Sequence, residues 1–409
     1  MSVQTIFILI ISIFIAETLL TKVLGYLNTL RWSDTIPAEL SDIYDADKYA
    51  SSQKYERAKY TFGWYSSIPS FIIMLLILVF GGFGWLDDFF RQYTQNEILL
   101  ALYFFGTISL LSSIISLPFS YYSTFVIEEK FGFNKMTKNL FFADALKGLL
   151  LSALIGAPLL SLIVFIYLTF GASFWIYAWI LTTLVSLFFM MFYSSLIVPL
   201  FNNQTPLEDG ELKTAIGAFG DKVGFKLDNI YVIDGSKRSS KANAYFSGFG
   251  PKKRIVLFDT LIKDLTTEEL VAVLAHEIGH YKKRHTLQML ALGTIQTGVI
   301  LFIFSLALAV PAVSQALGGQ VQSFHLGAVA FGILFTPISM IFGMISSIFS
   351  RKNEYEADAY AKENYSGEHL SQALIKLSRN NLSNLRPHPA YEFFYYSHPT
   401  VLKRLQALK

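Results

Sequence analysis

The sequence predicts an α-helical integral membrane protein with seven transmembrane helices. Of its 409 residues, 53% are hydrophobic and only 15% are charged, and the mean hydropathy is +0.44. Soluble domains carry about 25% charged residues, so this chain lacks the polar side chains needed to cover a water-soluble globule of its size. The absence of cysteine excludes a disulfide scaffold, a thiolate nucleophile and a cysteine-ligated metal.

Seven stretches are long and apolar enough to cross a bilayer, which takes about 20 residues of helix. The first lacks a basic segment before its apolar run, and that run is too long for a signal peptide, so we expect a retained helix. The seven predicted spans cover approximately residues 3–27, 64–86, 98–126, 149–170, 174–200, 287–310 and 324–349.

The basic residues gather on one side of these spans. All lysines and arginines except Lys22 and Arg91 lie in the segments 28–63, 127–148 and 201–286 or after residue 349. The positive-inside rule therefore predicts an N-terminus outside and a C-terminus in the cytoplasm. The net charge of +3 is too small to indicate nucleic acid, so the expected surroundings are the lipid bilayer and no nucleic acid.

This topology divides the chain into four parts. Residues 1–200 would hold spans one to five with their cytoplasmic loops, and residues 286–350 spans six and seven. Residues 201–285 and 351–409 would be cytoplasmic. In the first cytoplasmic part, the pattern predicts a short helix over 211–223 and three strands over 230–233, 242–246 and 254–258. The cytoplasmic domain is thus expected to be helical with a small β-sheet.

A pair of histidines carries the clearest chemical signal. His276 and His280 are four residues apart and would lie about 40° apart around a helix, so both rings can reach one metal ion. Glu277 lies close enough to take a proton from water held by that metal. Thr266 or Thr267 with Glu269 is a plausible N-cap for this helix. The plain alternative is a helix with two surface histidines.

A catalytic zinc takes three protein ligands and one open position. His285 would lie about 180° from His276 on a helix that continues into the sixth span, and is expected to point away. Spans six and seven form an antiparallel hairpin that would bring Glu354 to the same membrane boundary as third ligand. Asp358 shares the face of Glu354 and could orient an imidazole, while Glu356 would face the opposite way. The alternative is a solvated acidic helix face.

With these motifs, the chain resembles the type 1 CAAX prenyl endopeptidases, which are integral membrane zinc metallopeptidases with seven transmembrane helices. The resemblance covers nearly the whole chain. Besides the histidine and carboxylate motifs it includes SYYSTFVIEE (120–129), GFNK (132–135), PLFN (199–202), NAYF (243–246) and SHP (397–399).

The resemblance implies one Zn²⁺ per chain, bound by His276, His280 and Glu354, with Glu277 as general base. Asp358 would be either a proton donor or the partner of a zinc-bound histidine. His398 would hydrogen-bond the reacting carbonyl. Asn243, Ala244 and Tyr245 would lie on a strand that binds the extended substrate, a role that suits an edge strand.

The substrate implied by the resemblance is a peptide or protein, cleaved near the C-terminus of prenylated CAAX proteins. The compact chain also suggests a bacterial inner membrane, where the substrate would instead be a misfolded membrane protein or a lipidated peptide. Rival interpretations are a membrane quality-control protease, a transporter regulated by zinc, and a scaffold that binds lipidated tails.

Four residues have two interpretations from the sequence alone. Asn243 could be an ordinary turn residue and His398 a surface histidine. Arg404 could pair with the site or be a solvated charge. Glu17 lies within the first span, where an ionisable group is costly; it could line the water-filled chamber that the resemblance implies, or lie at the interface.

Overall fold

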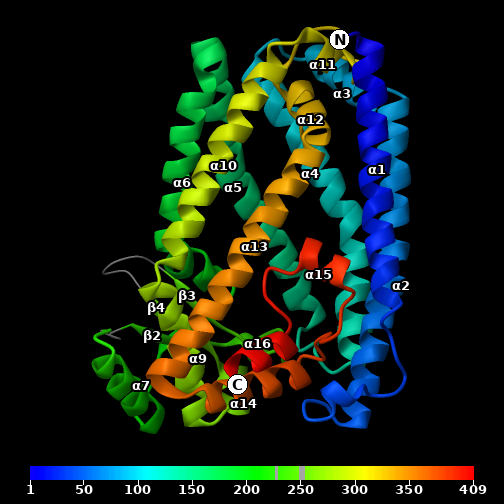
Figure 1. Cartoon of the computed structure of the whole chain (residues 1–409). Helices are drawn as coiled ribbons and strands as arrows, with labels where there is room; N and C mark the ends of the chain where they lie inside the picture. The colour runs from blue at the N-terminus through cyan, green and yellow to red at the C-terminus, as the bar shows by residue number, and fades with distance from the viewer. Residues whose placement is uncertain (226–228, 248–253) are drawn as a thin grey trace.

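The computed structural model describes residues 1–225, 229–247 and 254–409, which are mostly helical. The long helices run roughly side by side, and the sheet with its covering helices lies at one end of them (Figure 1). The two chain termini lie at opposite ends of the molecule (Figure 1). The long helices are α1 (Val3–Thr29), α2 (Ala46–Val79), α4 (Glu97–Tyr122), α5 (Lys138–Phe170), α6 (Phe174–Leu196), α10 (His285–Leu308), α12 (Phe324–Leu334) and α13 (Thr336–Ala361).

Shorter helices connect or cover the long ones. At the end near the N-terminus these are α3 (Gly82–Arg91) and α11 (Pro311–Gln315). At the opposite end they are α7 (Glu211–Lys222), α8 (Asp259–Asp264), α9 (Thr267–Lys282), α14 (Gly367–Asn380) and α16 (Val401–Leu408). α15 (Pro389–Tyr395) lies between the long helices, against α1 and α13 (Figure 1). A π-helical turn, η2 (Ser123–Glu128), extends α4. The helix predicted over 211–223 is confirmed as α7.

The predicted class of protein, an α-helical membrane protein with a small sheet, agrees with this architecture. By length and apolarity, the described residues hold five candidate spans, or up to six when α12 and α13, bent by 59°, count as one. That tally treats residues 138–200 as one stretch, although α5 and α6 are separate helices packed against each other. Counting α5 and α6 as two spans, and α12 with α13 as one, would give the predicted seven. The span count of seven stays a prediction.

One predicted span has different limits. We expected the second span over 64–86, but α2 begins at Ala46 and ends at Val79. Gly81 has a φ of 66°, a left-handed conformation that glycine adopts without strain, and there the chain turns into the separate helix α3. The second span therefore lies earlier in the chain than hydropathy alone predicts.

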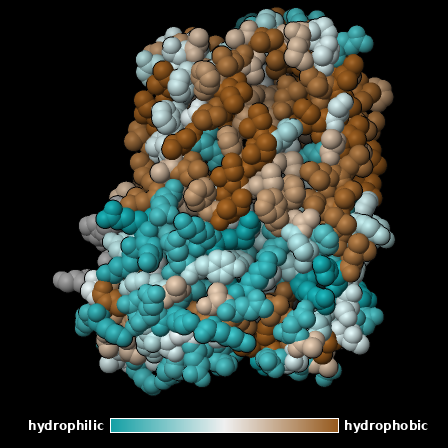
Figure 2. All heavy atoms as spheres, in the orientation of Figure 1, coloured by the Kyte–Doolittle hydropathy of each residue, from teal (hydrophilic) through white to brown (hydrophobic). Residues whose placement is uncertain are grey.

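Figure 2 shows a hydrophobic belt over the long helices and a hydrophilic surface over the end that carries the sheet. Glu17 of α1 is half-buried within this belt. Thr21, one turn further along the same face of α1, lies near Glu17 and 3.4 Å from the hydroxyl of Tyr395 in α15. The face that carries Glu17 is therefore turned toward the C-terminal part of the protein, as the cost of exposing an ionisable group to lipid predicts.

The small sheet has four strands in the order β1-β2-β4-β3. β1 (Gln204–Pro206) runs antiparallel to β2 (Ile230–Ile233), β2 runs parallel to β4 (Arg254–Phe258), and β4 runs antiparallel to β3 (Ala244–Ser247). The predictions for β2 and β4 are confirmed residue by residue. β3 starts two residues later than expected, so Asn243 precedes the strand instead of lying on it. β3 is an edge strand of this sheet.

The helix α9 carries both histidines and begins as the sequence predicts. Thr266 caps it by accepting a hydrogen bond from the Glu269 amide, and the Glu269 side chain accepts one from the Thr266 amide. The predicted continuation into the sixth span is wrong. α9 ends at Lys282, and Arg284 adopts a left-handed conformation with φ 59°, which sets α10 in a new direction.

Gly279 lets α9 and α13 approach closely enough to share the site. A Cβ atom at Gly279 would lie 3.1 Å from the Cα atom of Ala357 and 3.1 Å from the Cβ atom of Tyr360. Backbone atoms of a packed helix cannot move aside as a flexible side chain can. The glycine therefore fixes the distance between the two helices that carry the candidate metal ligands.

We expect Gly279→Val to push α13 away from α9 and to lower the free energy of unfolding by about 1–3 kcal/mol, the usual cost of overpacking. Thermal unfolding of the detergent-purified chain measures this change. Gly293→Val in α10 is the matched control, because among the described residues no atom beyond its chain neighbours and its own helix backbone lies within 4 Å of a Cβ at that position. Equal stability of the two variants would contradict the prediction.

Candidate metal centre

Three side chains converge between α9 and α13. Nε2 of His276 lies 3.1 Å from Nε2 of His280, and the Glu354 carboxylate lies 3.6 Å from the first ring and 3.3 Å from the second. Two ligands about 2.1 Å from a tetrahedral zinc lie roughly 3.4 Å apart, so these spacings fit one ion. Glu354 Oε2 is buried and makes no hydrogen bond among the described residues, as expected of an atom that faces a metal.

The donor set itself favours zinc. Two imidazole nitrogens and one carboxylate oxygen are the ligands of many catalytic zinc sites, and they leave the fourth position open. The sequence therefore predicted correctly which three side chains meet. The antiparallel arrangement of α10 and α13, which brings Glu354 back to α9, is the reason they meet.

Asp358 contacts the ring nitrogen of His276 that does not face the other two ligands. Its Oδ1 atom lies 2.8 Å from Nδ1 of His276. Because a carboxylate only accepts hydrogen bonds, Nδ1 carries the proton and Nε2 presents its lone pair to the metal position. Arg404 of α16 in turn donates two hydrogen bonds to Asp358, at 2.8 and 2.6 Å. Arg404 is only 8% exposed, so it is a partner of the site and not a solvated charge.

His285 does not point away from the site, and that prediction is wrong. The break at Arg284 restarts the helix at His285, whose Nδ1 lies 2.9 Å from Nδ1 of His280. Glu356, which we expected to face away from Glu354 and Asp358 on the same helix, accepts a hydrogen bond from Nε2 of His285 at 3.1 Å. The error for His285 arose because the 180° estimate assumed an unbroken helix.

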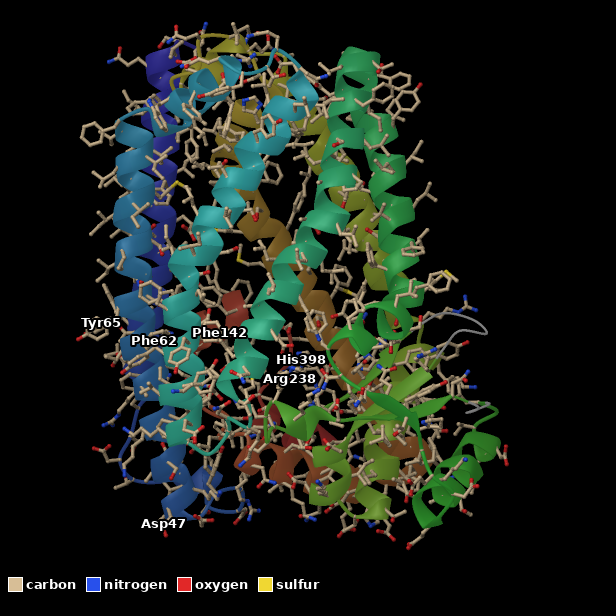
Figure 3. The ribbon with its side chains drawn as sticks, turned by 180° about the vertical axis from the view of Figure 1, so that it is seen from behind. Asp47, Phe62, Tyr65, Phe142, Arg238 and His398 are labelled. Carbon is tan, nitrogen blue, oxygen red and sulfur yellow. The ribbon has the colours of Figure 1, made fainter. Side chains whose placement is uncertain are left out.

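A cavity of about 480 Å³ opens over the three ligands. Glu277 lines it together with both histidines. His398 enters from the segment between α15 and α16, and its Nε2 lies 3.3 Å from Glu354 Oε1. Figure 3 shows His398 near the middle of the molecule, where the long helices meet the part that carries the sheet. The structure thus brings His398 to the site, although its side chain is 62% exposed.

The edge strand borders the same cavity. Asn243, Ala244 and Tyr245 all line it. Asn243 caps the start of β3, since its side-chain oxygen accepts a hydrogen bond from the Ala244 amide and its carbonyl accepts one from the Phe258 amide. An extended peptide in the cavity would therefore run beside a strand edge and within reach of the metal ligands.

The charges of the site favour ionised forms. Burial disfavours the charged form of His280, but its hydrogen bond to Glu354 and the negative charges of Glu354 and Glu277 outweigh burial and raise its pKa. Burial likewise disfavours charge on Arg404, and the hydrogen bonds to Asp358 outweigh it and raise the pKa of Arg404. In the metal-free protein, the acidic groups thus favour a positive charge where a metal cation would lie.

Known proteins resemble this chain along its whole length. A family model described as CAAX prenyl protease N-terminal, five membrane helices, matches residues 26–203, and that of Peptidase family M48 matches residues 206–409. CAAX prenyl protease 1 of Saccharomyces cerevisiae is 37% identical, covering 98% of this chain and 94% of the yeast protein. The human CAAX prenyl protease 1 homolog is 35% identical, covering 91% of this chain and 88% of the human protein. The crystal structure of S. mikatae Ste24p matches with a TM-score of 0.92 and 37% identity, covering 99% of each chain.

The fold, the donor set and these matches agree on one class, the integral membrane zinc metalloendopeptidases. The expectation of a peptidase is confirmed, and the transporter and scaffold interpretations are not favoured. Within this class, the chain belongs to the CAAX prenyl protease 1 family, in peptidase family M48.

Proposed function

We propose that this protein hydrolyses a peptide bond near the C-terminus of prenylated CAAX proteins, with one zinc ion per chain. The observation that carries the proposal is the convergence of His276, His280 and Glu354 at a cavity that an edge strand also lines. Relatives named CAAX prenyl protease 1 support the choice of substrate.

Each side chain at the cavity has a proposed role. Bound zinc would supply a Lewis acid and lower the pKa of a water molecule at the open position. Glu277 takes a proton from that water and passes it to the leaving amine, a task that its half-buried position beside the histidines allows. His398 donates a hydrogen bond to the reacting carbonyl as negative charge develops, a contribution of about 3–4 kcal/mol in comparable sites.

The remaining residues position these groups. Asp358, held by Arg404, orients the His276 ring, and this contact favours an orienting role over that of a proton donor. Asn243, Ala244 and Tyr245 bind the substrate backbone along the strand edge. The quality-control alternative would use the same groups on an unprenylated substrate.

The proposed topology places the N-terminus outside and both the cavity and the C-terminus on the cytoplasmic side. The clustering of basic residues supports this orientation, and termini at opposite ends of the molecule agree with an odd number of spans. The division into parts at residues 200, 285 and 350 belongs to the same proposal. The bacterial inner membrane stays a prediction from chain length.

Cleavage of a farnesylated CAAX peptide tests the function directly. We expect the detergent-purified chain, carrying one zinc per chain, to cut this peptide and to stop when a chelator removes the metal. Added zinc should restore cleavage. The unprenylated twin of the peptide is the control, and equal cleavage of both would contradict recognition of the lipid. Stoichiometric zinc without cleavage of either peptide would contradict the proposed substrate.

A further inference from the structure

His280 has a chain of partners behind its ring that the proposed function does not use. His285 lies against Nδ1 of His280, and Glu356 lies against His285. We propose that His285 and Glu356 are positioning residues, which together hold the His280 ring with Nε2 turned toward the metal. This inference rests on the proposed metal site and adds two residues to it.

Hydrogen-bond chemistry sets the direction of the chain. The Glu356 carboxylate can only accept, so Nε2 of His285 carries a proton. In a neutral His285 ring the other nitrogen, Nδ1, is then an acceptor. Nδ1 of His280 must therefore donate to it across the 2.9 Å contact. The lone pair that His280 would offer to a metal is then on Nε2, the nitrogen that faces His276 and Glu354.

The same logic rules out His285 as a metal ligand. Its Nε2 is occupied by Glu356 and its Nδ1 by His280. Its side chain is only 3% exposed, so the ring itself is shielded from water. The left-handed conformation of Arg284 is what turns His285 back onto His280. A strained residue held at that position is consistent with a functional constraint.

The two ligand histidines thus have matching supports. Asp358 holds Nδ1 of His276 directly, and Glu356 holds Nδ1 of His280 through His285. Both supporting carboxylates and the ligand Glu354 lie within little more than one turn of α13. One helix segment would therefore set the ligand and the orientation of both rings.

The test measures zinc affinity of the full chain in detergent by competition with a chelator. We expect Glu356→Gln and His285→Leu each to weaken zinc binding by about 10–100-fold, the usual effect of losing a partner behind a metal ligand. The visible spectrum of the Co²⁺-loaded protein should also change, because it reports ligand geometry. Glu363→Gln is the matched control, since Glu363 is an exposed acidic residue further along the same helical segment.

Glu356 is 38% exposed, so Glu356→Gln is not expected to unfold the protein even if His285→Leu does. Unchanged zinc affinity and an unchanged Co²⁺ spectrum in Glu356→Gln, with zinc bound normally to the unsubstituted chain, would overturn this inference alone. No zinc in the unsubstituted chain would instead overturn the proposed function, and this inference with it.

Discussion

Replacing Glu277 by glutamine is expected to leave zinc bound and to lower kcat by about 10²–10⁴-fold, the usual contribution of a general base. Glutamine has nearly the same shape, but its amide cannot take a proton from water. Glu277 lies beside the ligand cluster without belonging to it, so the metal site should persist. Steady-state cleavage of the farnesylated peptide, together with zinc analysis, measures both effects.

Glu268→Gln is the control for this experiment, because Glu268 is exposed near the start of the same helix, α9. It should cleave at the rate of the unsubstituted chain. Full activity of Glu277→Gln would remove Glu277 from the mechanism. Loss of zinc from that variant would show that Glu277 supports the metal site itself.

Replacing Arg404 by methionine is expected to lower the free energy of unfolding of the zinc-free protein by about 3–5 kcal/mol. The guanidinium holds Asp358 through two hydrogen bonds and lies 3.4 Å from Glu354. Its removal leaves two buried carboxylates without their shared counter-charge, which is the costly way to break a buried ion pair. Denaturant unfolding in detergent measures the loss.

Gln406→Met is the matched control, since it places the same side chain at an exposed position of the same helix, α16. It should change stability by less than about 0.5 kcal/mol. Similar stability of the two variants would show that Arg404 is not needed to neutralise the site.

The sequence predicted what depends on short-range geometry. The four-residue spacing of His276 and His280 needs only one regular helix, and the capping box at Thr266 marks where that helix begins. Glu354 followed from the direction of two neighbouring spans. Each of these inferences uses a repeat or a connection that can be read from the chain itself.

The predictions failed where the backbone conformation of a single residue changes the direction of the chain. A left-handed arginine has no clear signature in a sequence, so the break at Arg284 and the return of His285 were missed. Arg404 and His398 were candidates with a second interpretation left open, because local patterns do not specify the path of the C-terminal segment to the site. Gly279 could have been suspected, because glycine inside a helix costs about 1 kcal/mol and often permits close packing.

The position of Arg404 has a consequence for biosynthesis. This arginine is 128 residues beyond His276, and it donates two side-chain hydrogen bonds to Asp358, which also accepts one from His276. Nascent chains fold from the N-terminal end as they leave the ribosome. Both histidines are therefore made well before the cation that stabilises the buried carboxylates. Until the C-terminal residues have been made, the buried carboxylates Asp358 and Glu354 of a nascent chain therefore lack this counter-charge.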